Sequence, residues 1–146
     1  NKISVIRKVK IMLLIPKKAI QTATWNVLYS LYISSAKKST AKSLMAQIAL
    51  AQSEQYANSG SYFKTDFTPN CQPLNPIDKE EQLVAIEIAL FDGDQTIPRD
   101  GNYGYCIAGE DANNFVVIAS EFSGTDLTGC TFAIGRRGAI EATDDC

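Results

Sequence analysis

Apolar residues in the first part of the chain recur at the spacing of one face of an α-helix. Between residues 36 and 58 they stand at Ala41, Leu44, Met45, Ile48, Ala51 and Tyr56. A similar stripe upstream predicts that one helix runs from about Lys17 to Asn58. Such a helix is about 60 Å long, whereas a head of about 90 residues is about 30 Å across. We therefore expect part of the helix to protrude and to need a partner.

The pattern changes to turns and short strands after the predicted helix. Residues 61–78, rich in Pro, Asn and Asp, predict a long ordered loop. The apolar even-numbered positions of 84–90 predict a half-buried strand, and further strands are expected over 103–108, 115–120 and 130–134. Residues 135–138 predict a tight hairpin into 139–141. We expect an α+β fold, with a long N-terminal helix packed on a four-stranded antiparallel sheet.

Charge is distributed unevenly along the chain. Residues 1–53 hold nine Lys or Arg and no acidic residue, whereas residues 54–146 hold five basic and sixteen acidic residues. A basic arm of this kind meets acidic lipid, nucleic acid or the acidic head of another copy, or it is simply a solvated basic helix.

All four cysteines lie in the acidic part, and none forms a C-x-x-C pair: Cys71, Cys106, Cys130 and Cys146. The chain also contains no histidine. This excludes c-type haem attachment and disfavours zinc. Two disulfides in an oxidising compartment are expected, with all three pairings open, and buried free thiols are the alternative.

Candidate chemistry is sparse. No histidine is present to act as a base, and no base is identified for serines such as Ser120, so we predict no catalytic residue, no metal and no cofactor. The acidic residues around Asp92-Gly93-Asp94 lack the EF-hand pattern, which favours a solvated turn over a calcium site. Arg136 and Arg137 at the hairpin tip are possible surface-binding residues for phosphate or a neighbouring subunit.

One passage carries a family resemblance. Residues 41–63, AKSLMAQIALAQSEQYANSGSYF, resemble the helix-to-loop passage of type IV pilins and the related pseudopilins of secretion systems. The order of later features is also similar, with Tyr103-Gly104-Tyr105, the apolar strand 115–119, Gly129-Cys130-Thr131-Phe132 and a late cysteine. The similarity covers about three quarters of the chain, and it implies a pilin-like head.

The resemblance implies particular roles. It implies a Cys130–Cys146 disulfide around an exposed C-terminal loop, and a Cys71–Cys106 disulfide. It also implies a structural subunit of a bacterial surface filament, a homo-oligomer assembled from the inner membrane. A second pilin chain as a further partner stays open. Motility, adhesion, DNA uptake and secretion stay open. The alternative is a minor pilin-like binding module whose head recognises DNA, a surface or a secretion substrate.

The N-terminal part departs from the family pattern. Family members open with Phe-Thr-Leu-Ile-Glu and a nearly uncharged apolar helix, whereas residues 1–18 here carry six Lys or Arg, which are costly to bury. Three explanations stay open: a non-native N-terminal sequence, a basic arm that pairs with acidic heads, or a core supplied by another chain. We assign residues 1–35 to a protruding assembly segment and 36–146 to a disulfide-stapled head.

The filament-core helix is the remaining prediction. Trp25, Tyr29 and Tyr32 follow one another at helical spacing, with Leu28 and Leu31 between them. They are expected to stack in a filament core or to serve in ordinary helix packing.

Overall fold

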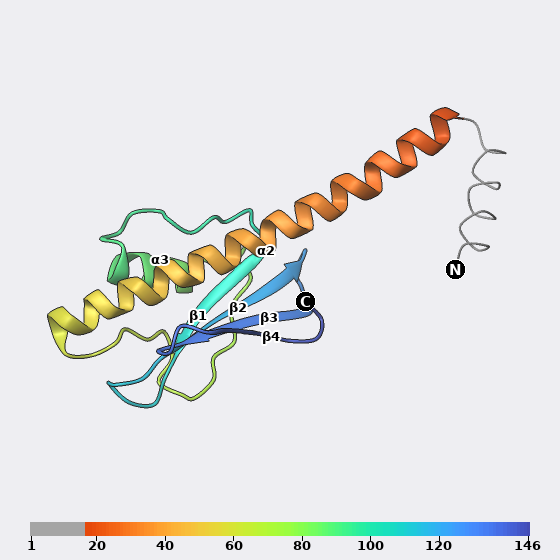
Figure 1. The fold of residues 1–146 in the computed structure, drawn as a ribbon. Coiled ribbons are helices and arrows are strands. Elements are labelled where there is room, and N and C mark those ends of the chain that lie inside the picture. Colours follow the sequence, from red (N-terminus) through yellow and green to blue (C-terminus); the bar gives the residue numbers. More distant parts are fainter. Residues whose placement is uncertain (1–16) are drawn as a thin grey trace. The chain divides into compact units, whose positions relative to one another are not determined.

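One helix, α2 (Lys17–Ser59), spans the first part of the chain that the structure describes (Figure 1). The structure is a computed structural model that describes the backbone of residues 17–146 and the side chains of residues 24–146. The predicted long helix is confirmed, while the earlier part of the predicted assembly segment lies outside the described residues. The chain divides into two compact units, residues 1–36 and 37–146, and α2 contributes to both.

The second unit contains an antiparallel meander of four strands in the order β1-β2-β3-β4. Its strands are β1 (Tyr103–Ala108), β2 (Val116–Ser123), β3 (Asp126–Gly135) and β4 (Ile140–Ala142). Each pairs with its neighbour along the chain. The helix lies over one face of the sheet, so the predicted α+β architecture is confirmed (Figure 1).

The core lies between the helix and this face of the sheet. Helix α2 contributes the predicted stripe, with Ala41, Leu44, Met45 and Ile48 at most 4% exposed. Alternate residues of the strands meet them: Tyr103, Tyr105 and Ile107 of β1, Val117 and Ala119 of β2, and Cys130, Phe132 and Ile134 of β3. Full burial of one such large side chain contributes about 1.5–3 kcal/mol. This contact accounts for the docking of the second half of α2.

The predicted strand over residues 84–90 is wrong, because these residues belong to a helix, α3 (Glu81–Leu90). The buried residues are Leu83, Ile86 and Glu87, which share one helical face, whereas Ile88 is 65% exposed. The apolar residues at even positions therefore do not form one buried face. The buried residue Leu83 stands at an odd position, three before Ile86, which is a helical spacing. Strand β4 takes the place of the missing strand, so the sheet still has four.

Two disulfides hold the second unit together. Cys71 in the long loop is bonded to Cys106 of β1, and Cys130 of β3 is bonded to Cys146. The predicted disulfides are therefore present, in the pairing that the resemblance to pilins implied. Backbone hydrogen bonds from Thr65 and Asp66 to the Ile107 carbonyl also fix the loop along β1. One edge of the sheet is thus covered, and β4 forms the other.

Candidate functional site

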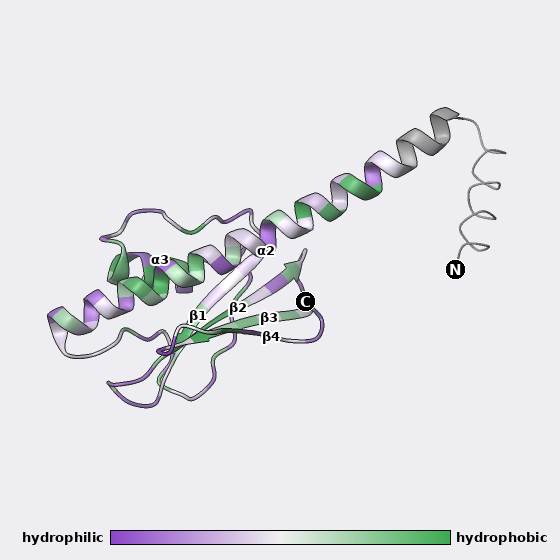
Figure 2. Ribbon diagram, viewed as in Figure 1, coloured by the Kyte–Doolittle hydropathy of each residue, from purple (hydrophilic) through white to green (hydrophobic). Residues whose placement is uncertain are grey.

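The described part of the first unit exposes a dense apolar segment of α2. Six large side chains there are 54–69% exposed: Trp25, Val27, Leu28, Tyr29, Leu31 and Tyr32. Figure 2 shows hydrophobic residues alternating with polar ones along this segment. All five predicted filament-core residues are among the six. Among the described residues, no helix is long and apolar enough to cross a membrane.

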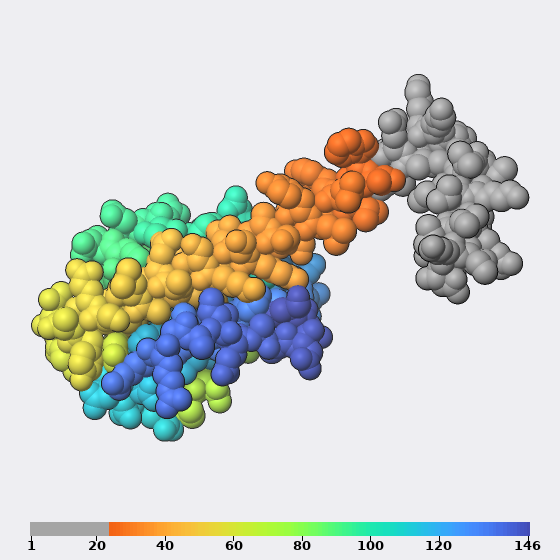
Figure 3. Space-filling view, viewed as in Figure 1, coloured from red at the N-terminus to blue at the C-terminus, as the bar shows by residue number. Residues whose placement is uncertain are grey.

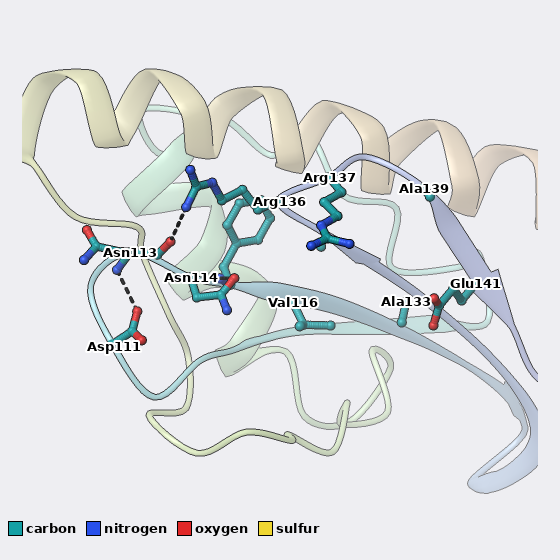
Figure 4. A pocket seen from close by; sticks show the side chains of 11 residues that line it. Asp111, Asn113, Asn114, Val116, Ala133, Arg136, Arg137, Ala139 and Glu141 are labelled. Atoms are coloured by element: carbon teal, nitrogen blue, oxygen red, sulfur yellow. Dashed lines mark hydrogen bonds between the residues drawn. The ribbon is translucent and has the colours of Figure 1, made fainter.

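A second candidate surface is a groove at the β3–β4 hairpin, with a volume of about 1020 Å³ (Figure 4). Its floor includes Val116 of β2 with Ala133 and Gly135 of β3, which alternate with the core residues and so belong to the face of the sheet opposite α2. None of these three side chains is larger than valine, which leaves open space above this part of the sheet. The 111–114 turn and the hairpin arginines form its rim.

Hydrogen bonds brace the two sides of this groove. Arg136 donates from Nη1 to the Asn113 carbonyl oxygen at 3.3 Å. The Asn113 amide N–H donates to Asp111 Oδ1 at 2.9 Å, and Tyr56 of α2 donates its hydroxyl to Asn113 Oδ1 at 2.9 Å. The hairpin tip, the 111–114 turn and the end of α2 are thus tied together. Arg136 therefore has a positioning role beside any binding role.

Arg137 differs from its neighbour. Figure 4 shows its guanidinium pointing away from that of Arg136, with Asp111 and Glu141 lying to either side of the two arginines. Within the described residues Arg137 makes no hydrogen bond or ion pair, and it is exposed. A guanidinium with five free donors is suited to a carboxylate or phosphate. The hairpin itself forms as predicted, with the Gly138 N–H donating to the Gly135 carbonyl oxygen at 3.0 Å.

The acidic turn after α3 is held by its backbone. The N–H groups of Phe91 and Gly93 both donate to the Glu87 carbonyl oxygen at 2.9 Å. Asp92 and Gly93 have φ values of 55° and 82°, a conformation that Gly, Asp and Asn adopt most readily. Asp92 and Asp94 are exposed, and their carboxylates make no hydrogen bond or ion pair within the part of the chain that the structure describes. In that part, no group of three acidic, Cys or His side chains is placed to hold a metal.

Strongly perturbed ionisable groups lie in the core and not at these surfaces. Burial raises the pKa of the Tyr105 phenol. For Tyr103 burial is again the largest cause of a raised pKa, and the hydrogen bond to Glu121 adds to it. Both phenols are therefore neutral at ordinary pH and fill space between helix and sheet.

Sequence reasoning found the arginines but missed the rest of the groove. Asp111, Asn113 and Asn114 stood in a segment treated only as a boundary between strands, and Glu141 stood at the end of the hairpin. The Asp-Ala-Asn-Asn run was a recognisable turn signal. Which residues this turn faces depends on the register of the sheet, and no local sequence pattern predicts that register.

Comparisons with protein-family models, curated proteins and solved structures give no match to this chain. The surfaces of the chain itself therefore have to support any functional inference.

Proposed function

We propose that this chain is a structural subunit of a type IV pilus-like bacterial surface filament, polymerising through its N-terminal helix. The observation that carries the proposal is the exposed apolar segment of α2. Its six large side chains are at least 54% exposed, whereas the apolar residues 41–48 on the buried face of the same helix are packed against the sheet. Clusters of exposed aromatic and aliphatic side chains typically mark an interaction site.

The fold of the second unit supports the proposal. One long helix on a small antiparallel sheet is the architecture that the resemblance to pilins implied. Two disulfides suit a head outside the cytosol, where oxidising conditions maintain them. We accordingly propose an extracellular location, a homo-oligomeric partner and contact with the inner membrane before assembly. No catalytic residue, cofactor or nucleic-acid partner is required.

Electron cryo-microscopy of material sheared from the cell surface tests the proposal. We expect filaments in which Trp25, Leu28, Tyr29, Leu31 and Tyr32 contact neighbouring copies and the second unit faces outward. Side-chain density along the helix would also identify the residues that precede α2. Surface preparations that contain this chain only as dispersed monomers would contradict the proposal.

The groove beside Arg137 favours a second candidate, a minor pilin-like binding module. The groove is braced by hydrogen bonds, and the Arg137 guanidinium has no partner among the described residues. This arrangement fits recognition of a surface or a secretion substrate by the head. The two candidates differ in stoichiometry, because a binding module is present in few copies and does not assemble by itself at high concentration. Sedimentation of the purified full chain over a range of concentrations distinguishes them.

A further inference from the structure

The charges that line the groove at the β3–β4 hairpin cancel. Two carboxylates, Asp111 and Glu141, stand against two guanidinium groups, Arg136 and Arg137. Figure 4 shows the carboxylates to either side of the two arginines. Arg137 alone suits an anion, but an anion long enough to fill the groove would also meet the carboxylates, and a cation would meet the guanidinium groups. The lining therefore favours a ligand that is polar but carries no charge.

The polar groups left free at the rim include both donors and acceptors. Asp111 accepts the Asn113 N–H through Oδ1, which leaves Oδ2 without a hydrogen bond in the part of the chain that the structure describes. Asn114 accepts the N–H of the following residue through Oδ1, and its amide nitrogen is likewise free there. Glu141 and Arg137 make no side-chain hydrogen bond or ion pair among the described residues. This mixture matches hydroxyl groups, because each hydroxyl both donates and accepts.

The floor of the groove does not suit a peptide. Val116, Ala133 and Gly135 belong to β2 and β3, which are the two inner strands, so the backbone beneath them is paired with neighbouring strands. An extended peptide binds by adding to a free strand edge, or it inserts large side chains into apolar pockets. This part of the floor offers neither feature. Its small apolar side chains can instead pack against the C–H groups of a sugar ring.

The groove is roomy, accessible and braced. Its volume of about 1020 Å³ is at the upper end of the usual range for ligand sites, roughly 300–1,000 Å³, which leaves room for more than one sugar ring. In the space-filling view the β3–β4 region lies at the surface beside α2 (Figure 3). Asn113 is held by hydrogen bonds from Arg136 and Tyr56. A wall that is already fixed loses little conformational entropy when a ligand binds.

We propose that this groove binds an uncharged saccharide chain. Asp111 and Glu141 accept hydrogen bonds from its hydroxyl groups, and Arg137 and Asn114 donate hydrogen bonds to them. The inference rests on the second candidate function, the binding module, and names the chemical class of its ligand. It does not require that the chain assemble into filaments, because a filament subunit can carry the same groove.

Calorimetric titration of the full chain with soluble neutral trisaccharides of glucose, galactose, mannose and N-acetylglucosamine tests the inference. We expect at least one of them to bind, with an affinity that changes less than about twofold between low and high salt, because the ligand has no charge to screen. Arg137→Ala and Glu141→Ala should each weaken binding by about tenfold, because each removes charge-assisted hydrogen bonds. Lys79→Ala and Asp126→Ala remove exposed charges outside the groove and are the matched controls.

A third variant, Ala133→Ile, occupies the floor without removing a polar group, and it should also weaken binding. Thermal melts confirm that each variant is folded. Three results would overturn the inference: no neutral trisaccharide binds, the affinity is the same in all three groove variants as in the wild type, or short peptides or acidic trisaccharides containing glucuronate bind more tightly. Sedimentation of the same chain measures self-assembly separately, so failure of the saccharide site leaves the proposed filament standing.

Discussion

The side-chain amide of Gln52, on α2, makes two hydrogen bonds with the backbone of Phe63. Gln52 Nε2 donates to the Phe63 carbonyl oxygen at 2.6 Å, and the Phe63 N–H donates to Gln52 Oε1 at 2.8 Å. The glutamine is completely buried. The Gln52 side chain therefore supplies both hydrogen-bond partners of the Phe63 backbone, which a neighbouring strand would supply in a sheet.

We expect Gln52→Leu to lower the free energy of unfolding by about 2–4 kcal/mol, because it leaves a backbone N–H and C=O without partners. Urea unfolding followed by circular dichroism measures this. Gln55→Leu is the matched control: Gln55 bonds only to Ser59 on the same helix, so its loss should change stability by less than about 0.5 kcal/mol. Equal losses of stability in Gln52→Leu and Gln55→Leu would show that the hydrogen bonds between Gln52 and Phe63 have no special role.

The Glu87–Arg99 pair predicts a dependence of stability on pH. The two ion-pair hydrogen bonds are 2.6 Å and 3.1 Å long, and Glu87 Oε2 also accepts the Ile97 N–H at 2.9 Å. Burial acts to raise the pKa of Glu87, but the hydrogen bonds from Arg99 and Ile97 and the charge of Arg99 bring the pKa below its ordinary value.

A lowered pKa in the folded state means that the carboxylate form stabilises the fold. This contribution is present above the unfolded pKa, near 4.5, and is lost as the pH falls through the lower folded pKa. We expect Glu87→Gln to be less stable than the wild type at pH 7, with the difference narrowing below about pH 4.5. Thermal melts from pH 7 to pH 3 measure it. A difference that is constant with pH would contradict the ionic role of Glu87.

The geometry of the same pair predicts that lysine cannot replace Arg99. A guanidinium binds Glu87 through two nitrogens and reaches Glu80 with a third, at 3.1 Å, whereas an ammonium is a single point charge. We expect Arg99→Lys to recover only part of the roughly 3 kcal/mol that Arg99→Ala loses by leaving a buried carboxylate unpaired. Chemical denaturation of the two variants at pH 7 makes the comparison.

Gly104 lies against the Leu74 carbonyl oxygen, so closely that a Cβ added to the glycine would overlap that atom. We expect Gly104→Ala to cost more than about 2 kcal/mol, because the loop pinned by Cys71 has little room to move. Gly135→Ala is the control, since its nearest neighbour would be the Phe115 carbonyl oxygen at 3.6 Å, an ordinary contact. The midpoint of thermal unfolding compares them, and equal midpoints would mean that the loop yields easily.

How far the sequence predicts this fold depends on how local each signal is. The part of the predicted stripe from Ala41 to Ile48 and the Gly135–Gly138 hairpin each involve residues within a few positions of one another, and both were predicted correctly. The stripe was also predicted to include Tyr56, which is 37% exposed. The strand expected over 84–90 was wrong because the apolar residues of so short a segment fit both the two-residue period of a strand and the 3.6-residue period of a helix. The packing of α3 against β1, with Leu83 buried, decides for the helix. The groove needed the register of β2 on β3, which places Val116 opposite Gly135 and is a property of the whole sheet.

The exposed segment of α2 leads to the last prediction, which separates assembly from folding. Trp25 and Tyr29 are 69% and 67% exposed, so the double variant Trp25→Ala/Tyr29→Ala should leave the free energy of unfolding of the head within about 0.5 kcal/mol of the wild type. Because their exposed rings are the proposed contacts between copies, the same variant should lower the yield of sheared filament strongly. Leu50→Ala is the matched control: Leu50 is 74% exposed on the same helix but lies outside the predicted filament-core residues, and its filament yield should be unchanged. Filament counts by electron microscopy, read beside thermal melts, test both halves. Normal filament yield from the double variant would show that the aromatic side chains are not the assembly contact, whatever the helix does otherwise.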